Sequence, residues 1–266
     1  MVNWHKFVSG RWWLARPRKW FAYAVLITVS WLGFIFFRLI NWTKVEGREK
    51  FRSARRRHQE RGRQNVIIVS NHLTMYDSFM VGIIAFFPEL IFWPSVAPFH
   101  LAASENFYKH WFFRLILYCL NALPVKPSRV DLEVMKKILG LLPNSNVHIF
   151  PGGRRSFEPL GNEAAHPIRA GIGYILANAP EPKPLVVPVH IGGIEKIFGG
   201  APGQKGTARW FPRLGGILRR PLVKFGDPVK WQDIIESQGN NKEAWQAVAQ
   251  RIAEAINQLA PSNSVP

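Results

Sequence analysis

An unbroken apolar segment near the N-terminus, from Trp20 to Ile40, constrains the fold of this chain more than any other feature. Its only strongly polar side chain is that of Arg38, close to its end. About 20 apolar residues suffice to cross the hydrocarbon core of a bilayer, and a cleavable signal peptide is shorter and ends in a small-residue site. Tryptophans gather at membrane interfaces. We therefore expect these to bind the membrane: Trp12, Trp13, Trp20 and Trp31.

Basic residues lie on both sides of this segment. Residues 1–63 hold 15 Lys and Arg against 3 Asp and Glu, whereas residues 64–266 hold 20 against 14. Such clusters attract anionic lipid headgroups, at about 1 kcal/mol per Lys or Arg. Positive residues prefer the cytoplasmic side, and here they flank both ends. The pattern favours a helix that lies in one leaflet over one that spans, with the rest of the chain on the cytoplasmic face, although spanning stays open.

A high isoelectric point also suits nucleic-acid binding. The chain carries a net charge of +18. It shows no recognition-helix pattern, no zinc-finger spacing and no RNA-binding aromatic motif. We therefore expect no nucleic-acid partner.

From residue 64 onward the pattern changes to that of a globular α/β domain. Short β-branched runs alternate with helix-compatible stretches, which predicts a mixed, mostly parallel sheet flanked by helices. We divide the chain into residues 1–63, an apolar helix with a solvated basic connector that associates with the membrane, and residues 64–266. The predicted strands are 66–69, 147–150, 185–191 and 222–225, and the predicted helices are 78–87, 105–121, 131–142, 168–178 and 242–259.

A histidine and an aspartate follow the first predicted strand, in Asn71-His72-Leu73-Thr74-Met75-Tyr76-Asp77. Five residues correspond to about 500° of an α-helix, so the two side chains would not share a helix face. They can meet if His72 lies in the turn after the strand and Asp77 in the first turn of the next helix, where active sites of open α/β sheets gather. A neutral imidazole held by a carboxylate can then take a proton from a hydroxyl group. Both are candidate catalytic residues.

The other reactive side chains indicate no second centre. Cys119 is the single cysteine, which rules out an internal disulfide, and it lies in an apolar stretch where a thiol is normally inert. His148, His166 and His190 lack the spacing and the supporting side chains that hold a metal. We therefore expect no bound metal and no bound cofactor.

Four short blocks occur in order along the chain. They are Asn71–Asp77, Asn121–Lys126 leading to Arg129, Phe150-Pro151-Gly152-Gly153-Arg154-Arg155-Ser156, and Val187–Ile191. The order and spacing resemble the NHxxxxD, G-x-I-x-V-D-R, F-P-E-G-T-R-S and V-P-V-x-I blocks of the PlsC-like glycerolipid acyltransferases, the lysophosphatidic-acid acyltransferase family. The resemblance covers about residues 44–230 and implies the glycerolipid acyltransferase fold.

The resemblance also implies residue roles. His72 and Asp77 would be the catalytic dyad, and Arg155 would bind the acceptor's phosphate through its planar, bidentate guanidinium. Glycines in the third block would let backbone N–H groups approach a phosphate or a developing oxyanion. The remaining substrate-binding residues implied are Gly152, Gly153, Arg154 and Arg129.

The chain departs from the family pattern on the acceptor side. Gly152 replaces the glutamate of the third block and Arg154 replaces its threonine, while Ser104 stands where many members carry a lysine. The dyad is intact. The departures leave the headgroup of the acceptor open.

The implied function is O-acyl transfer in phospholipid biosynthesis. A fatty acyl group would move from acyl-CoA or acyl carrier protein, the co-substrate, to the free hydroxyl of 1-acyl-sn-glycerol 3-phosphate and give phosphatidic acid. The partners would be a lipid acceptor, an acyl thioester donor and an anionic membrane surface. Two alternatives stay open, the same chemistry on a lipid alcohol without phosphate and a catalytically silent lipid-binding scaffold. A thioesterase would need no membrane element.

Overall fold

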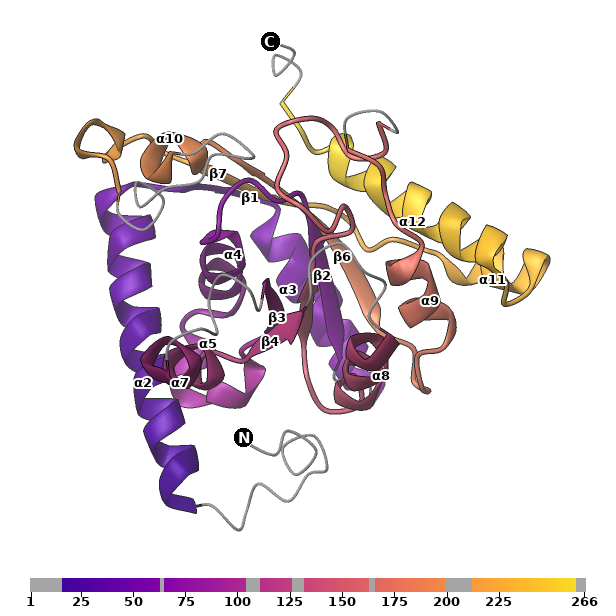
Figure 1. The fold of residues 1–266 in the computed structure, drawn as a ribbon, viewed down its shortest axis with the longest axis horizontal. Helices are drawn as coiled ribbons and strands as arrows, with labels where there is room; N and C mark the ends of the chain where they lie inside the picture. Colours follow the sequence, from indigo (N-terminus) through magenta and orange to yellow (C-terminus); the bar gives the residue numbers. More distant parts are fainter. Residues whose placement is uncertain are drawn as a thin grey trace.

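The computed structural model describes residues 16–62, 65–103, 111–125, 132–162, 166–199 and 212–261. Within these residues a seven-stranded sheet runs in the order β1-β7-β6-β2-β5-β3-β4 (Figure 1), and the β6–β7 pair alone is antiparallel. The mixed, mostly parallel α/β sheet is therefore confirmed. The strands are β1 (Lys44–Glu46), β2 (Val66–Ser70), β3 (Phe99–Ala103), β4 (Ala122–Val125), β5 (Val147–Ile149), β6 (Leu185–Gly192) and β7 (Leu222–Phe225).

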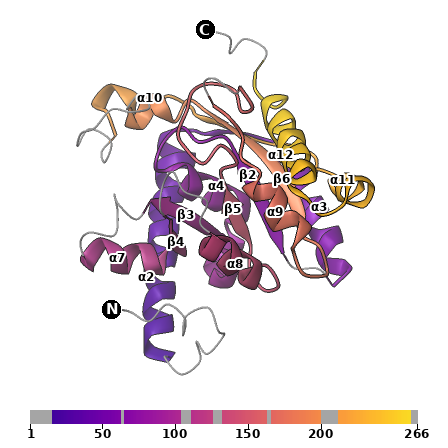
Figure 2. The ribbon, with the colours of Figure 1, turned by 45° about the vertical axis from the view of Figure 1, so that its right-hand side comes forward.

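Helices cover both faces of the sheet (Figures 1 and 2). One face carries α2 (Arg16–Phe34), which continues as the π-helical turn η2 (Ile35–Ile40), together with α3 (Arg48–Glu60), α4 (Asp77–Phe86) and α5 (Glu89–Phe92). The other face carries α8 (Leu132–Leu141), α9 (Gly171–Ala177), α11 (Gln232–Gln238) and α12 (Lys242–Asn257). Shorter pieces are α7 (Trp111–Cys119), α10 (Glu195–Phe198), η3 (Pro94–Val96) and η5 (Leu214–Gly216).

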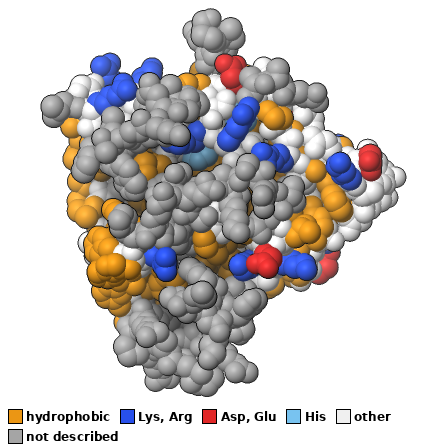
Figure 3. Space-filling view, in the orientation of Figure 1, with side chains coloured by type: hydrophobic (Ala, Val, Ile, Leu, Met, Phe, Trp, Pro, Cys, Tyr) orange, Lys and Arg blue, Asp and Glu red, His pale blue; other side chains and the backbone are white. Residues whose placement is uncertain are grey.

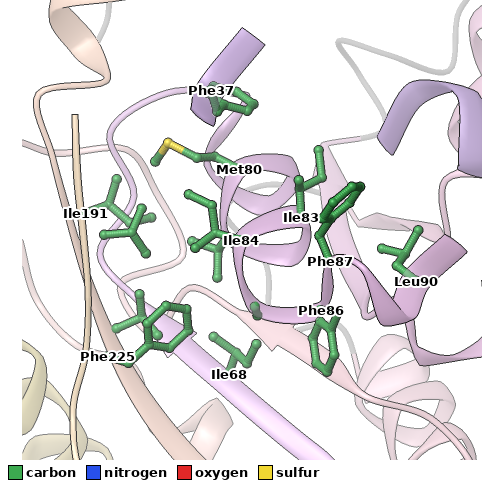
Figure 4. Packing of buried hydrophobic residues seen from close by; sticks show 14 of the residues in the cluster. Phe37, Ile68, Met80, Ile83, Ile84, Phe86, Phe87, Leu90, Ile191 and Phe225 are labelled. Atoms are coloured by element: carbon green, nitrogen blue, oxygen red, sulfur yellow. The ribbon is translucent and has the colours of Figure 1, made fainter. Parts of the chain in front are cut away.

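Strand β2 explains the two-sided core. All five of its residues are buried, and its alternate side chains enter different clusters, Val66 and Ile68 towards α4, Ile67 and Val69 towards α12. A strand covered on both faces needs a continuous apolar run, which the sequence provides here. Figure 4 shows Ile68 facing the apolar side chains of α4, with Ile191 from β6 and Phe225 from β7.

The sequence predicted a solvated basic helix or connector over residues 48–63, and the described part of this stretch is solvated on one face only. It does form a helix, α3, but Phe51 is fully buried and packs with ring centroids 5.7 Å from Phe86 and 5.2 Å from Phe225. The many charged residues of this helix do not prevent burial, because Phe51, Ala54, Arg55 and His58 share one helix face. Strand β1 pairs with β7 as well, so residues before the proposed boundary at 63/64 contribute to the sheet.

The apolar helix α2 packs along the domain with one face and leaves the other exposed. Gly33 allows close approach to α4, since a Cβ there would lie 2.3 Å from Cδ1 of Ile83. The Phe34 ring stacks on Phe87 at 3.9 Å. The segment Trp20–Ile40 is long and apolar enough to cross a membrane, and 17% of its most apolar window is buried. Trp20 and Trp31 are both exposed. Figure 3 shows apolar side chains gathered on the side of the molecule where α2 lies in Figure 1.

Candidate active site

The His72–Asp77 pair forms where strand β2 passes into helix α4. His72 lies in the turn after the strand, and Asp77 is the first residue of the helix. Nδ1 of His72 lies 2.9 Å from Oδ2 of Asp77. The predicted turn-and-helix arrangement thus brings the two side chains together.

Asp77 is fully buried and is held by donors from its own turn. Its Oδ2 accepts the backbone N–H groups of Leu73 at 2.6 Å and Thr74 at 2.9 Å, and its Oδ1 accepts the Thr74 hydroxyl at 2.7 Å. A buried charge is tolerated when hydrogen bonds satisfy it, and these donors also fix the carboxylate against the imidazole. Since Nδ1 faces Asp77, Nε2 of His72 is the nitrogen left to accept a proton.

Contacts from the third and fourth blocks hold His72 in place. The Phe150 ring stacks on the imidazole with centroids 3.9 Å apart, and the backbone N–H of Ser156 donates to the His72 carbonyl oxygen at 2.9 Å. The Asn71 side chain makes two hydrogen bonds of 2.8 Å with the backbone of Ile191. Its Nδ2 donates to the Ile191 carbonyl oxygen, and its Oδ1 accepts the Ile191 N–H. These blocks meet because β2 lies between β5 and β6 in the sheet.

A cavity of about 840 Å³ opens beside His72. Its wall is mostly apolar and comes from α2, η2, α4, β3 and α7, and Phe198 and Phe150 also line it. Its polar side chains include His72, Ser78 and Arg155. The size lies within the range of small-molecule sites, and the apolar lining suits a hydrocarbon chain whose reactive end reaches an imidazole.

The predicted substrate-binding residues separate in the structure. Arg155 is half-buried and lines the cavity, whereas Arg154 is exposed. Gly153 adopts a positive φ of 65° that favours glycine, and its N–H donates to the Phe150 carbonyl oxygen at 2.9 Å, which closes the turn. Arg129, Trp12 and Trp13 lie outside the described residues.

The structure supplies a reason for glycine at position 152. A Cβ there would lie 2.0 Å from Nε2 of His166, whose ring is fully buried against the turn. Nδ1 of His166 lies 3.2 Å from the Glu158 carbonyl oxygen, and burial lowers the pKa of the ring. A neutral imidazole thus occupies the space into which the family's glutamate would extend from this position.

Two further histidines lie buried near the dyad. Nε2 of His148 lies 2.8 Å from the Ser70 hydroxyl, and burial lowers its pKa to about 3, with nearby His100 and His72 adding to the effect. Burial lowers the pKa of His100 to about 4. Cys119 is buried, which raises the pKa of its thiol and leaves it a poor nucleophile.

Within the described parts of the chain, no three His, Cys, Asp or Glu side chains come together as a metal site. His148 lies on β5 and His190 on β6, and burial lowers the pKa of both. The described side chains of this region therefore provide a histidine–aspartate pair that can transfer a proton, next to an apolar cavity.

Sequence reasoning missed three contributors to the site. Thr74 was identifiable, since Thr-x-x-Asp before an apolar run is the spacing of a reciprocal helix cap. Phe150 and the wall formed by α2 had no local pattern, because both depend on how distant elements pack.

Comparison with known protein families gives a match over most of the domain. A family model described as acyltransferase matches residues 43–192, more than half of the chain. The matched range runs from the start of the sheet to the end of β6 and contains His72, Asp77 and Arg155. A search of curated proteins finds no match to the chain.

Proposed function

Because the chain belongs to the acyltransferase family, that of the PlsC-like glycerolipid acyltransferases, we propose that it acylates a lipid hydroxyl with His72 as the general base. Acyl transfer to a lipid is the activity of the family. The observation that carries the finer proposal is the 2.9 Å His72–Asp77 contact at the wall of an apolar cavity.

The proposed reaction needs no covalent enzyme intermediate. Nε2 of His72 takes the proton of the acceptor hydroxyl as its oxygen attacks the thioester carbonyl carbon. Asp77 stabilises the imidazolium that forms. The tetrahedral intermediate collapses, the carbon–sulfur bond breaks, and the departing thiolate takes the proton from His72. The products are the ester and the free thiol, and the dyad returns to its starting state.

We propose 1-acyl-sn-glycerol 3-phosphate as the acceptor and acyl-CoA or acyl carrier protein as the donor. Arg155 supports the acceptor assignment, since it is the arginine of the third block that lines the cavity. A guanidinium binds a phosphate with two parallel hydrogen bonds. The product would be phosphatidic acid, made on the cytoplasmic face of the membrane.

An acceptor panel tests this proposal. Purified protein in detergent is incubated with labelled acyl-CoA or acyl carrier protein and with 1-acylglycerol 3-phosphate, monoacylglycerol or a long-chain alcohol. We expect the phosphate-bearing acceptor to be acylated fastest. Arg155→Gln should raise its KM by about tenfold or more, the scale of a lost hydrogen bond to a charged group, and Arg154→Gln is the matched control with an exposed side chain.

Two outcomes would contradict the proposal. Acylation confined to acceptors without phosphate would contradict the phosphate-bearing acceptor. It would favour a site for a lipid alcohol without phosphate, next to the neutral ring of His166 at Gly152. Equal inactivity of the native protein and His72→Ala on every acceptor would favour the lipid-binding scaffold.

A further inference from the structure

A group of arginines with little compensating charge lies at the far end of helix α4 from Asp77. The guanidinium groups of Arg48 and Arg52, one turn apart on α3, both donate to the carbonyl oxygen of Phe87, Arg52 at 3.1 Å. Arg38, from the end of the apolar segment, donates to the Thr43 carbonyl oxygen at 2.6 Å. We call Arg38, Arg48 and Arg52 the arginine cluster.

The cluster is short of negative charge. Among the described residues, its one carboxylate contact is Glu49, which lies 3.7 Å from Arg52 on a side chain that is 84% exposed. The neighbouring Glu89 is taken by Arg55 at 2.5 Å. Burial lowers the pKa of Arg48 to about 10. The charges of Arg52 and Arg38 add to the effect, and those of Glu49 and Glu89 oppose it without cancelling it.

The cluster also holds unused donors. In the described structure, Nε of Arg48 and Nε of Arg52 are buried without a hydrogen-bond partner. Helix α3 begins at Arg48 after Gly47, which provides no side-chain cap, so the positive end of the helix dipole lies at Arg48. The side chain of Arg52 is 31% exposed and Arg38 is exposed, so an anion can reach the cluster from solvent.

The cluster lies directly beside the apolar face of α2. Phe87 connects the two features. Its carbonyl oxygen accepts from Arg48 and Arg52, and its ring centroid lies 3.9 Å from that of Phe34 and 5.1 Å from that of Trp31. Trp31 is 45% exposed. Figure 4 shows Phe87 at the end of α4, close to Leu90. An ammonium or guanidinium group at the edge of an apolar membrane-facing surface lies at the depth of lipid headgroups.

We propose that the arginine cluster binds the phosphate of an anionic lipid headgroup in the membrane on which α2 docks. Guanidinium forks are donors that phosphate prefers, and the positive end of a helix dipole favours an anion. The ten residues of α4 place Phe87, which Arg48 and Arg52 bind, about 15 Å from Asp77 at 1.5 Å per residue. The site is therefore distinct from the active site and does not depend on the proposed reaction.

Vesicle binding tests this site without any assay of activity. Full-length protein is sedimented with vesicles of phosphatidylcholine alone or with phosphatidylglycerol added. We expect Arg48→Gln with Arg52→Gln to weaken binding to the anionic vesicles by about tenfold or more, since each Arg near a surface contributes several-fold. Binding to phosphatidylcholine alone should change little.

Matched variants separate a site from diffuse attraction. Arg56→Gln with Arg57→Gln removes the same charge from the exposed face of the same helix, and we expect a loss several times smaller. Arg48→Lys with Arg52→Lys keeps the charge but removes the planar fork, and we expect it to weaken anionic vesicle binding as well. Equal losses in the two Gln pairs, together with native binding by the Lys pair, would overturn the proposal.

Two measurements separate the lipid site from a folding defect and from a site for a soluble phosphate. Thermal unfolding shows whether a variant is folded; if the Gln pair does not fold, the Lys pair decides. Titration with free CoA should give the same affinity for native protein and the Gln pair. A fall in CoA affinity with unchanged vesicle binding would assign the cluster to a soluble phosphate and contradict the lipid site.

Discussion

At position 77 a carboxylate suits its surroundings better than any other side chain. Its oxygens accept two backbone N–H groups, a threonine hydroxyl and the ring N–H of His72. An amide would turn an NH₂ group towards one of these donors and leave buried groups unpaired, at a cost of about 1–3 kcal/mol. The same contacts that seat the residue therefore keep His72 in the tautomer that leaves Nε2 free to accept a proton.

Gly152→Ala tests the packing of His166 against the third block. The added methyl group would meet Nε2 of His166 at 2.0 Å, and we expect a loss of about 1–3 kcal/mol in the free energy of unfolding. Urea unfolding at equilibrium measures it. In a His166→Ala background the same change should cost much less, whereas an equal cost in both backgrounds would contradict the packing.

Acid should destabilise the fold through His148 and His100. Their folded pKa values, about 3 and about 4, lie below the ordinary value of 6.5 because both rings are buried. Below pH ~6.5 the unfolded chain therefore binds more protons than the folded chain. The contribution of the two neutral rings to the free energy of unfolding is complete above that pH and is lost as the pH falls towards ~4. At pH ~5 each ring should cost about 2 kcal/mol. Urea unfolding between pH ~7.5 and ~5 measures this fall in the free energy of unfolding, and His148→Gln should remove the part that is due to His148. A free energy of unfolding that does not change with pH would contradict the prediction.

At this scale the dyad was predictable because both residues are neighbours in sequence, on either side of one turn. The pair of hydrogen bonds between Asn71 and Ile191 was not, since the two residues are far apart in the chain and meet only through the β2–β6 pairing. The role of Gly152 was not either, because its constraint is the His166 ring from a later loop.

At the scale of elements, strands that contain Val or Ile together with other strand-forming residues were predicted, and strands without this composition were not. β2, β5, β6 and β7 lie where the sequence placed them. β3 contains His100 and two alanines, and β4 contains Pro124, so neither has strong intrinsic strand preference; their parallel pairing and position in the sheet determine their conformation. β1, with three residues, lies within a basic stretch.

Helix α2 is part of the cavity wall as well as an exposed apolar surface, and Gly33 packs so closely on Ile83 of α4 that a Cβ would lie 2.3 Å from its Cδ1. Gly33→Leu places a branched side chain at this approach and narrows the cavity. We expect kcat/KM for long-chain substrates to fall by about tenfold or more, which is the effect of displacing a few methylene groups from an apolar site. The kcat/KM for short-chain substrates should fall less. Rates across a series of acyl donors and acceptors measure this, and an equal loss at all lengths would contradict the chain-binding role of the cavity.

At the scale of the whole molecule, the exposed aromatic residues indicate how the protein would bind a membrane. Beside α2, the exposed set includes Phe92 and Trp93 at the end of α5 and Trp111 and Phe112 on α7. A helix that spans alone would not need aromatic partners on the domain against which it packs. We therefore expect α2 to embed in one leaflet together with these residues.

Tags at the two ends of the chain test this orientation. In sealed vesicles, we expect an N-terminal and a C-terminal tag to be digested or protected together by added protease, because an embedded α2 leaves both ends on one side. Digestion of one tag with protection of the other would show that the segment spans the bilayer.

The central claim is that His72 and Asp77 act as one unit in deprotonating a lipid hydroxyl, and a double-mutant cycle tests it most directly. Single-turnover acyl transfer is measured for the native protein, His72→Ala, Asp77→Asn and the double variant. We predict that Asp77→Asn slows transfer by about 10³–10⁴-fold, that His72→Ala reduces it to background, and that the double variant is no slower than His72→Ala. Native-like transfer by His72→Ala, or an Asp77→Asn loss of the same factor whether or not His72 is present, would contradict the claim.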